Sequence, residues 1–172
     1  MEIITYVREG AITHQDSLGN AGRTEAGDVQ VMSAGSGIRR AEYNLESVAT
    51  KIFQIWIEPT QQGGPPTWGA KPFPKSDRSG RFVTIASGTG GDTEALPIRA
   101  DARVLAATLK AGERIEYALG EARNGYLVPA AGVVEINGVR VSARDGAAIR
   151  HESALTVTAL EDAELVFADA AW

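Results

Sequence analysis

The sequence predicts an all-β protein, and three observations support this prediction. Apolar and β-branched residues are grouped in short runs separated by Gly, Asn, Asp and Pro, which is typical of strands joined by turns. The dipeptide Asn137-Gly138 lies between two apolar runs and is the strongest short signal for a hairpin. No segment keeps helical spacing for more than two turns, although a single turn is expected at 76–78 or 99–102.

The first third of the chain predicts four strands. Along 29–33, Val29, Val31 and Ser33 alternate with Gln30 and Met32, as expected of a strand with one buried face. The segment 16–20 (Asp-Ser-Leu-Gly-Asn) is typical of a turn. The predicted strands are residues 3–7, 11–16, 29–33 and 52–57.

A proline-rich segment follows these strands. Five of the seven prolines fall between Pro59 and Pro74. Because proline has no backbone donor for a sheet ladder, we expect this segment to be an inter-domain linker or a surface loop. Trp68 and Phe73 are expected to hold it against the core.

The rest of the chain again predicts strands only. A weak repeat relates the two halves of the whole chain, since apolar residues at 6–7 and at 126–128 each precede a Gly-Asp or Asp-Gly turn at similar spacing. This suggests two copies of one β-barrel unit. The predicted strands are residues 81–87, 104–109, 114–119, 125–128, the hairpin 133–141, 155–160 and 164–167.

Composition limits the classes of function. The 172 residues carry a net charge of −5, which argues against a nucleic-acid surface built of clustered Lys and Arg. Cysteine is absent, so disulfides and thiolate metal sites are excluded. The sequence has no apolar run of membrane-spanning length and no signal segment, so we expect no membrane partner and a cytoplasmic location.

The chain carries a series of motifs at residues 1–10, 14–20, 32–39, 42–44 and 54–57. These motifs closely resemble the pirin family, and especially the bacterial pirin-like proteins, some of which act as quercetin 2,3-dioxygenases. The resemblance is specific over the first sixty residues and looser to the end, where 155–164 is similar to the family's final strands. It implies a bicupin, two antiparallel β-barrels, here with a first barrel that is incomplete. The implied domains are a truncated N-terminal cupin barrel at 1–60, a linker at 61–80 and a C-terminal cupin barrel at 81–172.

The resemblance also implies a metal site that this chain does not reproduce. In the family a metal, usually iron, is held by three histidines and one glutamate of the N-terminal barrel, and two of the histidines form an H-x-H motif. The positions of that motif lie upstream of Met1, and the third histidine falls at Arg40. Only the glutamate is retained, at Glu42, so we expect no metal, with iron or another divalent ion as the alternative. The C-terminal barrel of the family carries no metal, and here it offers only His151.

The pocket residues expected at this vestigial position are Arg40, Glu42 and Gln54. Arg40 and Glu42 are two residues apart on an extended segment and therefore face the same side. Either the guanidinium pairs with Glu42 in the former metal space, or both side chains are simply solvated. Gln54 either lines the pocket or is a hydrogen-bonded core residue, and His14 is expected to be structural rather than a ligand.

Two functions remain open from the sequence. One is a pirin-like protein without metal or dioxygenase activity that binds a small aromatic ligand or a protein partner. The other is a metal-dependent quercetin 2,3-dioxygenase-like enzyme whose true N-terminus lies upstream of Met1. Exposed strand edges in the first barrel predict a homo-oligomer, in which another chain or the Pro59–Pro74 segment covers the gap.

Overall fold

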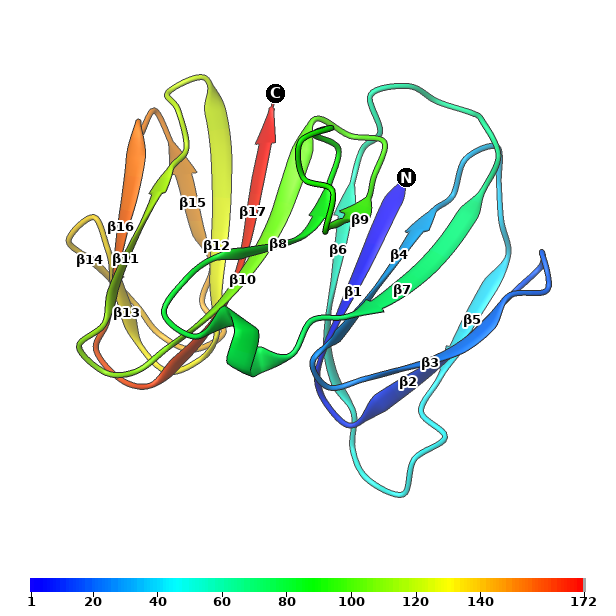
Figure 1. Cartoon of the computed structure of the whole chain (residues 1–172), viewed down its shortest axis with the longest axis horizontal. Coiled ribbons are helices and arrows are strands. Elements are labelled where there is room, and N and C mark those ends of the chain that lie inside the picture. Colours follow the sequence, from blue (N-terminus) through cyan, green and yellow to red (C-terminus); the bar gives the residue numbers. More distant parts are fainter. Residues whose placement is uncertain (172) are drawn as a thin grey trace. The chain divides into compact units, whose positions relative to one another are not determined.

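The computed structural model describes residues 1–171 and confirms the all-β prediction (Figure 1). Within these residues the only helical element is η1 (Lys75–Arg78), at one of the two places where a single turn was expected. The strands are β1 (Glu2–Glu9), β2 (Ala11–Asp16), β3 (Ala21–Glu25), β4 (Asp28–Ser33), β5 (Arg40–Tyr43), β6 (Lys51–Ile57), β7 (Thr67–Pro72), β8 (Val83–Ser87), β9 (Leu96–Pro97), β10 (Ala102–Leu109), β11 (Arg114–Ala118), β12 (Arg123–Ala131), β13 (Val134–Ile136), β14 (Val139–Val141), β15 (Ala147–Arg150), β16 (Ala154–Ala159) and β17 (Ala163–Ala171).

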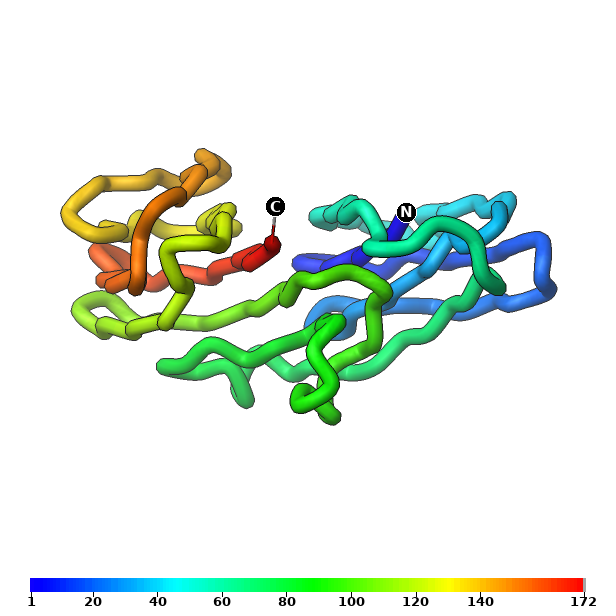
Figure 2. Tube along the Cα trace, turned by 90° about the horizontal axis from the view of Figure 1, so that it is seen from above, coloured from blue at the N-terminus to red at the C-terminus, as the bar shows by residue number. Residues whose placement is uncertain are grey.

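The chain forms two compact units. Unit 1 contains residues 1–74 and 86–101, and unit 2 contains residues 75–85 and 102–171. The segment 86–101 therefore returns to unit 1, where β9 lies against β4 and β7 (Figure 2). β8 runs from unit 2 into unit 1, where its last two residues pair with β9.

Unit 1 is built from two antiparallel sheets. One has the strand order β6-β1-β4-β7 and the other the order β3-β2-β5. The period of two along β1 and β4 separates two sets of side chains. Ile4 and Tyr6 are buried on one face together with Val29 and Val31, while the polar Thr5 lies on the other face and pairs in register with the polar Gln30.

The structure corrects the expectation that the proline-rich segment contains no strand. Residues 67–72 form β7, which pairs with β4 along its whole length. Proline is tolerated because β7 is an edge strand and Pro72 is its last residue. Phe73 is buried and Trp68 packs on His14, as the sequence predicted for the aromatic residues of this segment.

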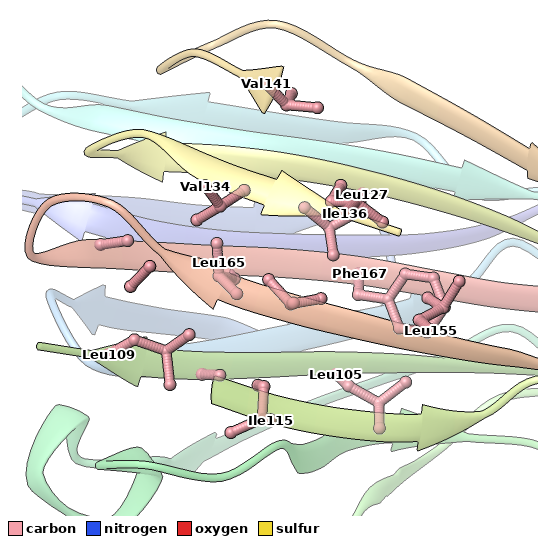
Figure 3. Close-up of a cluster of buried hydrophobic side chains, with 14 of the residues drawn as sticks. Leu105, Leu109, Ile115, Leu127, Val134, Ile136, Val141, Leu155, Leu165 and Phe167 are labelled. Carbon is pink, nitrogen blue, oxygen red and sulfur yellow. The ribbon is translucent and has the colours of Figure 1, made fainter. Parts of the chain in front are cut away.

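Unit 2 has a continuous apolar core. It lies between β10, β12 and β17 on one side and β11, β13 and β16 on the other, and Figure 3 shows its largest side chains. The predicted hairpin forms β13 and β14, with Asn137 and Gly138 at φ values of 47° and 84°, the left-handed conformation that this two-residue turn requires. The side chains of the core include Leu105, Leu127, Leu155, Leu165 and Phe167.

Candidate functional site

A polar cluster lies between the two sheets of unit 1. Arg40 and Glu42 alternate along β5 and face the same side. β5 pairs with β2 so that His14 lies opposite Glu42 and Asp16 lies opposite Arg40. Four ionisable side chains are thereby placed on one face of two strands, two of them in the β2 segment and two in the β5 segment.

The other sheet of unit 1 contributes a row of uncharged polar side chains. Thr5 of β1 pairs with Gln30 of β4 on one side and with Gln54 of β6 on the other. Because the three residues are in register, their side chains lie side by side on the same face. Thr5 and Gln30 are almost fully buried, and Thr24 of β3 donates to the Gln30 carbonyl over 3.0 Å.

Glu42 accepts hydrogen bonds on both of its carboxylate oxygens. Oε1 accepts from Gln30 Nε2 at 2.6 Å and from Thr5 Oγ1 at 3.4 Å. Oε2 accepts from Arg40 Nη1 at 2.7 Å and from Gln54 Nε2 at 2.9 Å. A carboxylate offers about four lone-pair positions, so these four donors saturate it.

Arg40 is bound at two points. Besides the ion pair with Glu42, its Nη2 donates to Gln54 Oε1 over 2.8 Å. The side chains of Arg40 and Glu42 are 19% and 15% exposed, so the pair is shielded from most of the solvent. Of the two possibilities that the sequence left open, the structure has the ion pair, and the expected residues Arg40, Glu42 and Gln54 contact one another directly.

Trp56 lies at the border of this cluster rather than in the core. Its Nε1 donates to the same Gln54 oxygen over 2.9 Å, yet the residue is 59% exposed. Most of the Trp56 side chain is therefore open to solvent. Among the residues that the structure describes, β6 pairs with β1 only, so no further strand covers Trp56 from that side.

His14 is fully buried and supports Asp16. Its Nε2 lies 3.0 Å from Asp16 Oδ2, and its ring stacks on Trp68 with an interplanar angle of 7°. Burial raises the pKa of the Asp16 carboxyl, but hydrogen bonds from His14, from Asn20 and from the Leu18 backbone outweigh it and lower the pKa to about 2. This fixed turn is consistent with the structural role expected for His14.

Unit 2 contains a separate polar network around Asp169. Tyr117 Oη donates to Asp169 Oδ2 over 2.5 Å, and Arg123 pairs with the other oxygen. Burial and the adjacent Asp169 raise the pKa of Tyr117 to about 12, so the phenol stays protonated. His151 is exposed between β15 and β16.

Comparisons with known proteins identify the family. Residues 1–57 match the family Pirin, and residues 84–170 match the quercetinase C-terminal cupin domain. A pirin-like protein of Caulobacter vibrioides is 75% identical over 99% of this chain and 74% of its own length. The chain belongs to the pirin family.

Relatives of known structure agree with this membership of the pirin family. The crystal structure of the bacterial pirin YhhW from Escherichia coli in complex with nickel(II) superposes with a TM-score of 0.91 at 34% identity, covering 99% of this chain and 72% of that one. The quercetin 2,3-dioxygenase of Escherichia coli K12 is 35% identical over 98% of this chain and 72% of its own length. The fold is therefore an all-β bicupin of the pirin type, as the resemblance implied, and the chain spans about three quarters of the length of these relatives.

The polar cluster of this pirin does not fit a divalent metal. A non-haem metal site takes neutral imidazoles together with a carboxylate and keeps open positions. Within the described residues no three His, Cys, Asp or Glu side chains are grouped to hold an ion. Glu42 has no unoccupied lone pair, and the cation that it binds is the guanidinium of Arg40.

Sequence reasoning missed two members of the cluster, Thr5 and Gln30. Both are polar residues inside otherwise apolar strands, with Thr5 between Ile4 and Tyr6 and Gln30 between Val29 and Val31. A buried polar residue at an inward position needs a partner. That rule was the available signal, but the identity of the partner, Glu42, depends on the pairing of strands far apart in sequence.

No helix among residues 1–171 has the length and apolar character that crossing a membrane would need.

Proposed function

We propose that this pirin-family chain binds no catalytic metal in unit 1 and acts as a ligand-binding or protein-interaction module. The observation that carries the proposal is the position of Arg40, whose guanidinium is bound to Glu42 and Gln54. Arginine is charged at every physiological pH, so its cation cannot be removed by deprotonation. Its place is the one where the family resemblance puts a neutral histidine.

Electrostatics supports the proposal. At an effective dielectric constant of about 20, two unit charges of the same sign about 4 Å apart repel by about 4 kcal/mol, and a divalent ion would double this figure. A metal would also have to displace the donors that saturate Glu42. A single carboxylate offers too little in return, because tight sites for such ions use three or more protein ligands.

Metal content tests the first half of the proposal. The purified chain is exposed to iron, nickel, manganese and zinc, dialysed and measured by mass spectrometry, with the Escherichia coli pirin YhhW as a positive control for nickel. We expect no ion near one per chain, and we expect the same for Arg40→His, because one imidazole and Glu42 are still too few ligands. About one ion per wild-type chain would contradict the proposal.

Ligand binding tests the second half. Trp56 is largely exposed beside Gln54, so a planar aromatic molecule that docks at the cluster should quench its fluorescence. Quercetin is the probe, titrated in the presence of a metal chelator, and Trp56→Phe is the matched control that should remove the signal. If wild type shows no quenching, the interaction role is favoured over the ligand-binding role.

The second candidate is a metal-dependent quercetin 2,3-dioxygenase. It is favoured by the 35% identity to the Escherichia coli enzyme of that name. Oxygen uptake with quercetin, measured with and without each metal, separates the two candidates. Metal-dependent turnover by the wild-type chain would establish the enzyme, and its absence in a chain that still binds quercetin would favour the module.

A further inference from the structure

Two polar nitrogen atoms are enclosed in unit 1 without a partner from the protein. Both His14 Nδ1 and Trp68 Nε1 are buried, and within residues 1–171 no group lies at hydrogen-bond distance from either atom. Buried polar groups almost always have a partner, which is either another protein group or an ordered water molecule. Two such atoms on one pair of stacked rings therefore indicate a binding site for a small polar molecule.

The strands of unit 1 enclose this site themselves. His14 of β2 is fully buried, and its ring stacks on the ring of Trp68 of β7 with the centroids 5.1 Å apart. Gly22 of β3 lies opposite His14 in the ladder, and a Cβ there would lie 2.4 Å from Trp68 Cη2. Glycine at this position thus leaves the space that the indole ring fills. Because the described residues already cover both nitrogen atoms, only a molecule small enough to be enclosed with them can be their partner.

The two nitrogen atoms need opposite hydrogen-bond roles from their partner. Asp16 is ionised at neutral pH, because its hydrogen bonds lower its pKa to about 2, so its oxygens act only as acceptors. His14 Nε2 lies 3.0 Å from Asp16 Oδ2, and this contact assigns the ring proton to Nε2. In the neutral ring Nδ1 is then an acceptor, whereas the indole N–H of Trp68 is only a donor. One partner that serves both atoms must donate to His14 and accept from Trp68.

We propose that unit 1 binds a single water molecule that donates a hydrogen bond to His14 Nδ1 and accepts one from Trp68 Nε1. Water is a very small molecule that has both roles, and buried waters typically make about three hydrogen bonds to groups that otherwise lack a partner. A metal ion cannot be the shared partner, because a protonated indole nitrogen has no lone pair to offer.

The bound water makes His14 a positioning residue. It holds the ring in the tautomer that donates to Asp16, and Asp16 in turn accepts from the backbone of Leu18 and Asn20 in the turn between β2 and β3. It also occupies the free lone pair of the only histidine in unit 1. The inference concerns atoms that lie apart from Arg40 and Glu42, so it does not depend on the function proposed above.

Nitrogen-15 NMR of the wild-type chain tests the proposal directly. We expect the His14 ring to be a single tautomer with its proton on Nε2 and with the chemical shift of a hydrogen-bonded acceptor at Nδ1. The chain has one other histidine, His151, which is exposed and should show the average of exchanging forms. The indole proton of Trp68 should cross-relax with a water molecule that stays bound far longer than surface water. A proton on His14 Nδ1, or a Trp68 indole proton without this contact, would overturn the proposal.

Trp68→Phe tests the bridge, because it keeps an aromatic ring on His14 and removes the indole donor. The number of long-lived internal waters, measured by oxygen-17 relaxation dispersion, should fall by one relative to wild type. Trp56→Phe is the matched control, since it removes an indole that is largely exposed, and it should leave the number unchanged. The same number in wild type and in Trp68→Phe would contradict the bridge. If Trp68→Phe does not fold, the tautomer of His14 and the water contact of Trp68 in the wild-type chain still decide the question.

Discussion

Removing the Arg40 guanidinium should destabilise unit 1, and the size of the effect follows from its burial. Losing one partner of a fully buried ion pair destabilises a protein by about 3–5 kcal/mol, whereas a solvent-exposed pair contributes about 0–1 kcal/mol. Arg40 and Glu42 are 19% and 15% exposed, which lies nearer the buried case. We expect Arg40→Met to lower the free energy of unfolding by about 2–3 kcal/mol.

A double-mutant cycle separates the pair itself from other effects of the substitution. Glu42→Gln removes the negative charge and keeps one of the two side-chain oxygens, which can accept from either Gln30 or Gln54. If the charges act on each other, the double variant should lose less unfolding free energy than the two single variants lose together. The difference should be about 1.5–2.5 kcal/mol. The assay is urea unfolding followed by tryptophan fluorescence, because Trp56 and Trp68 both lie in unit 1.

Arg23 provides the matched control for this cycle. It pairs with Glu25 and Glu46 at similar distances, but half of its side chain is exposed. Arg23→Met should therefore change stability much less than Arg40→Met does. A coupling energy between Arg40 and Glu42 below about 0.5 kcal/mol would refute the reasoning, because solvated side chains would give that result.

Three further predictions concern packing and titration. Gly22→Ala should lower the free energy of unfolding by about 1–3 kcal/mol, because a Cβ there would lie 2.4 Å from Trp68 Cη2. A Cβ at Gly91 would meet nothing within 4 Å, so Gly91→Ala is the control and should change the free energy of unfolding by at most about 0.5 kcal/mol. Thermal unfolding measures both. The pKa of Asp16 is about 2 in the folded chain and 3.8 without its partners. Its ionised carboxylate therefore contributes to the free energy of unfolding, on the order of 1 kcal/mol after solvent screening. This contribution is present above pH 4 and is lost as the pH falls to 2. Asp16→Asn should flatten this part of the stability profile, and an unchanged slope would contradict the assignment. In ultraviolet absorbance titration one of the four tyrosines should ionise only near pH 12, and Tyr117→Phe should remove that late step.

Strands with a clear period were predictable, and strands defined by their neighbours were not. A period of two is present along 29–33 in the sequence itself, and the strands predicted at 11–16 and 29–33, β2 and β4, were found within a residue of their ends. β3 contains Ala, Gly and charged residues, and β15 is half alanine, so neither has strand propensity. Both are strands because β2 and β12 pair with them, which shows that strand formation depends on tertiary context.

The contacts of the candidate site could be predicted only in part, because some of them depend on the pairing of strands far apart in the chain. Arg40 and Glu42 share one face because of local geometry, and the structure places Gln54 beside them. The sequence could not show that His14 pairs with the position of Glu42, because that register joins strands separated in the chain by β3 and β4. It also could not show that Trp56 is exposed, because exposure follows from the place of β6 at the end of its sheet within residues 1–171.

The retention of Glu42 has a structural explanation that requires no metal. Its two oxygens hold together side chains from four strands, with Thr5, Gln30 and Gln54 on one sheet and Arg40 beside it on the other. Each of those buried polar groups would lose a partner if the carboxylate were replaced by an apolar side chain, at about 1–3 kcal/mol per unsatisfied group. An arginine at position 40 then neutralises the charge that a metal neutralises in other proteins. A carboxylate of this kind persists because the two sheets depend on it, and its presence alone is not a sign of catalysis.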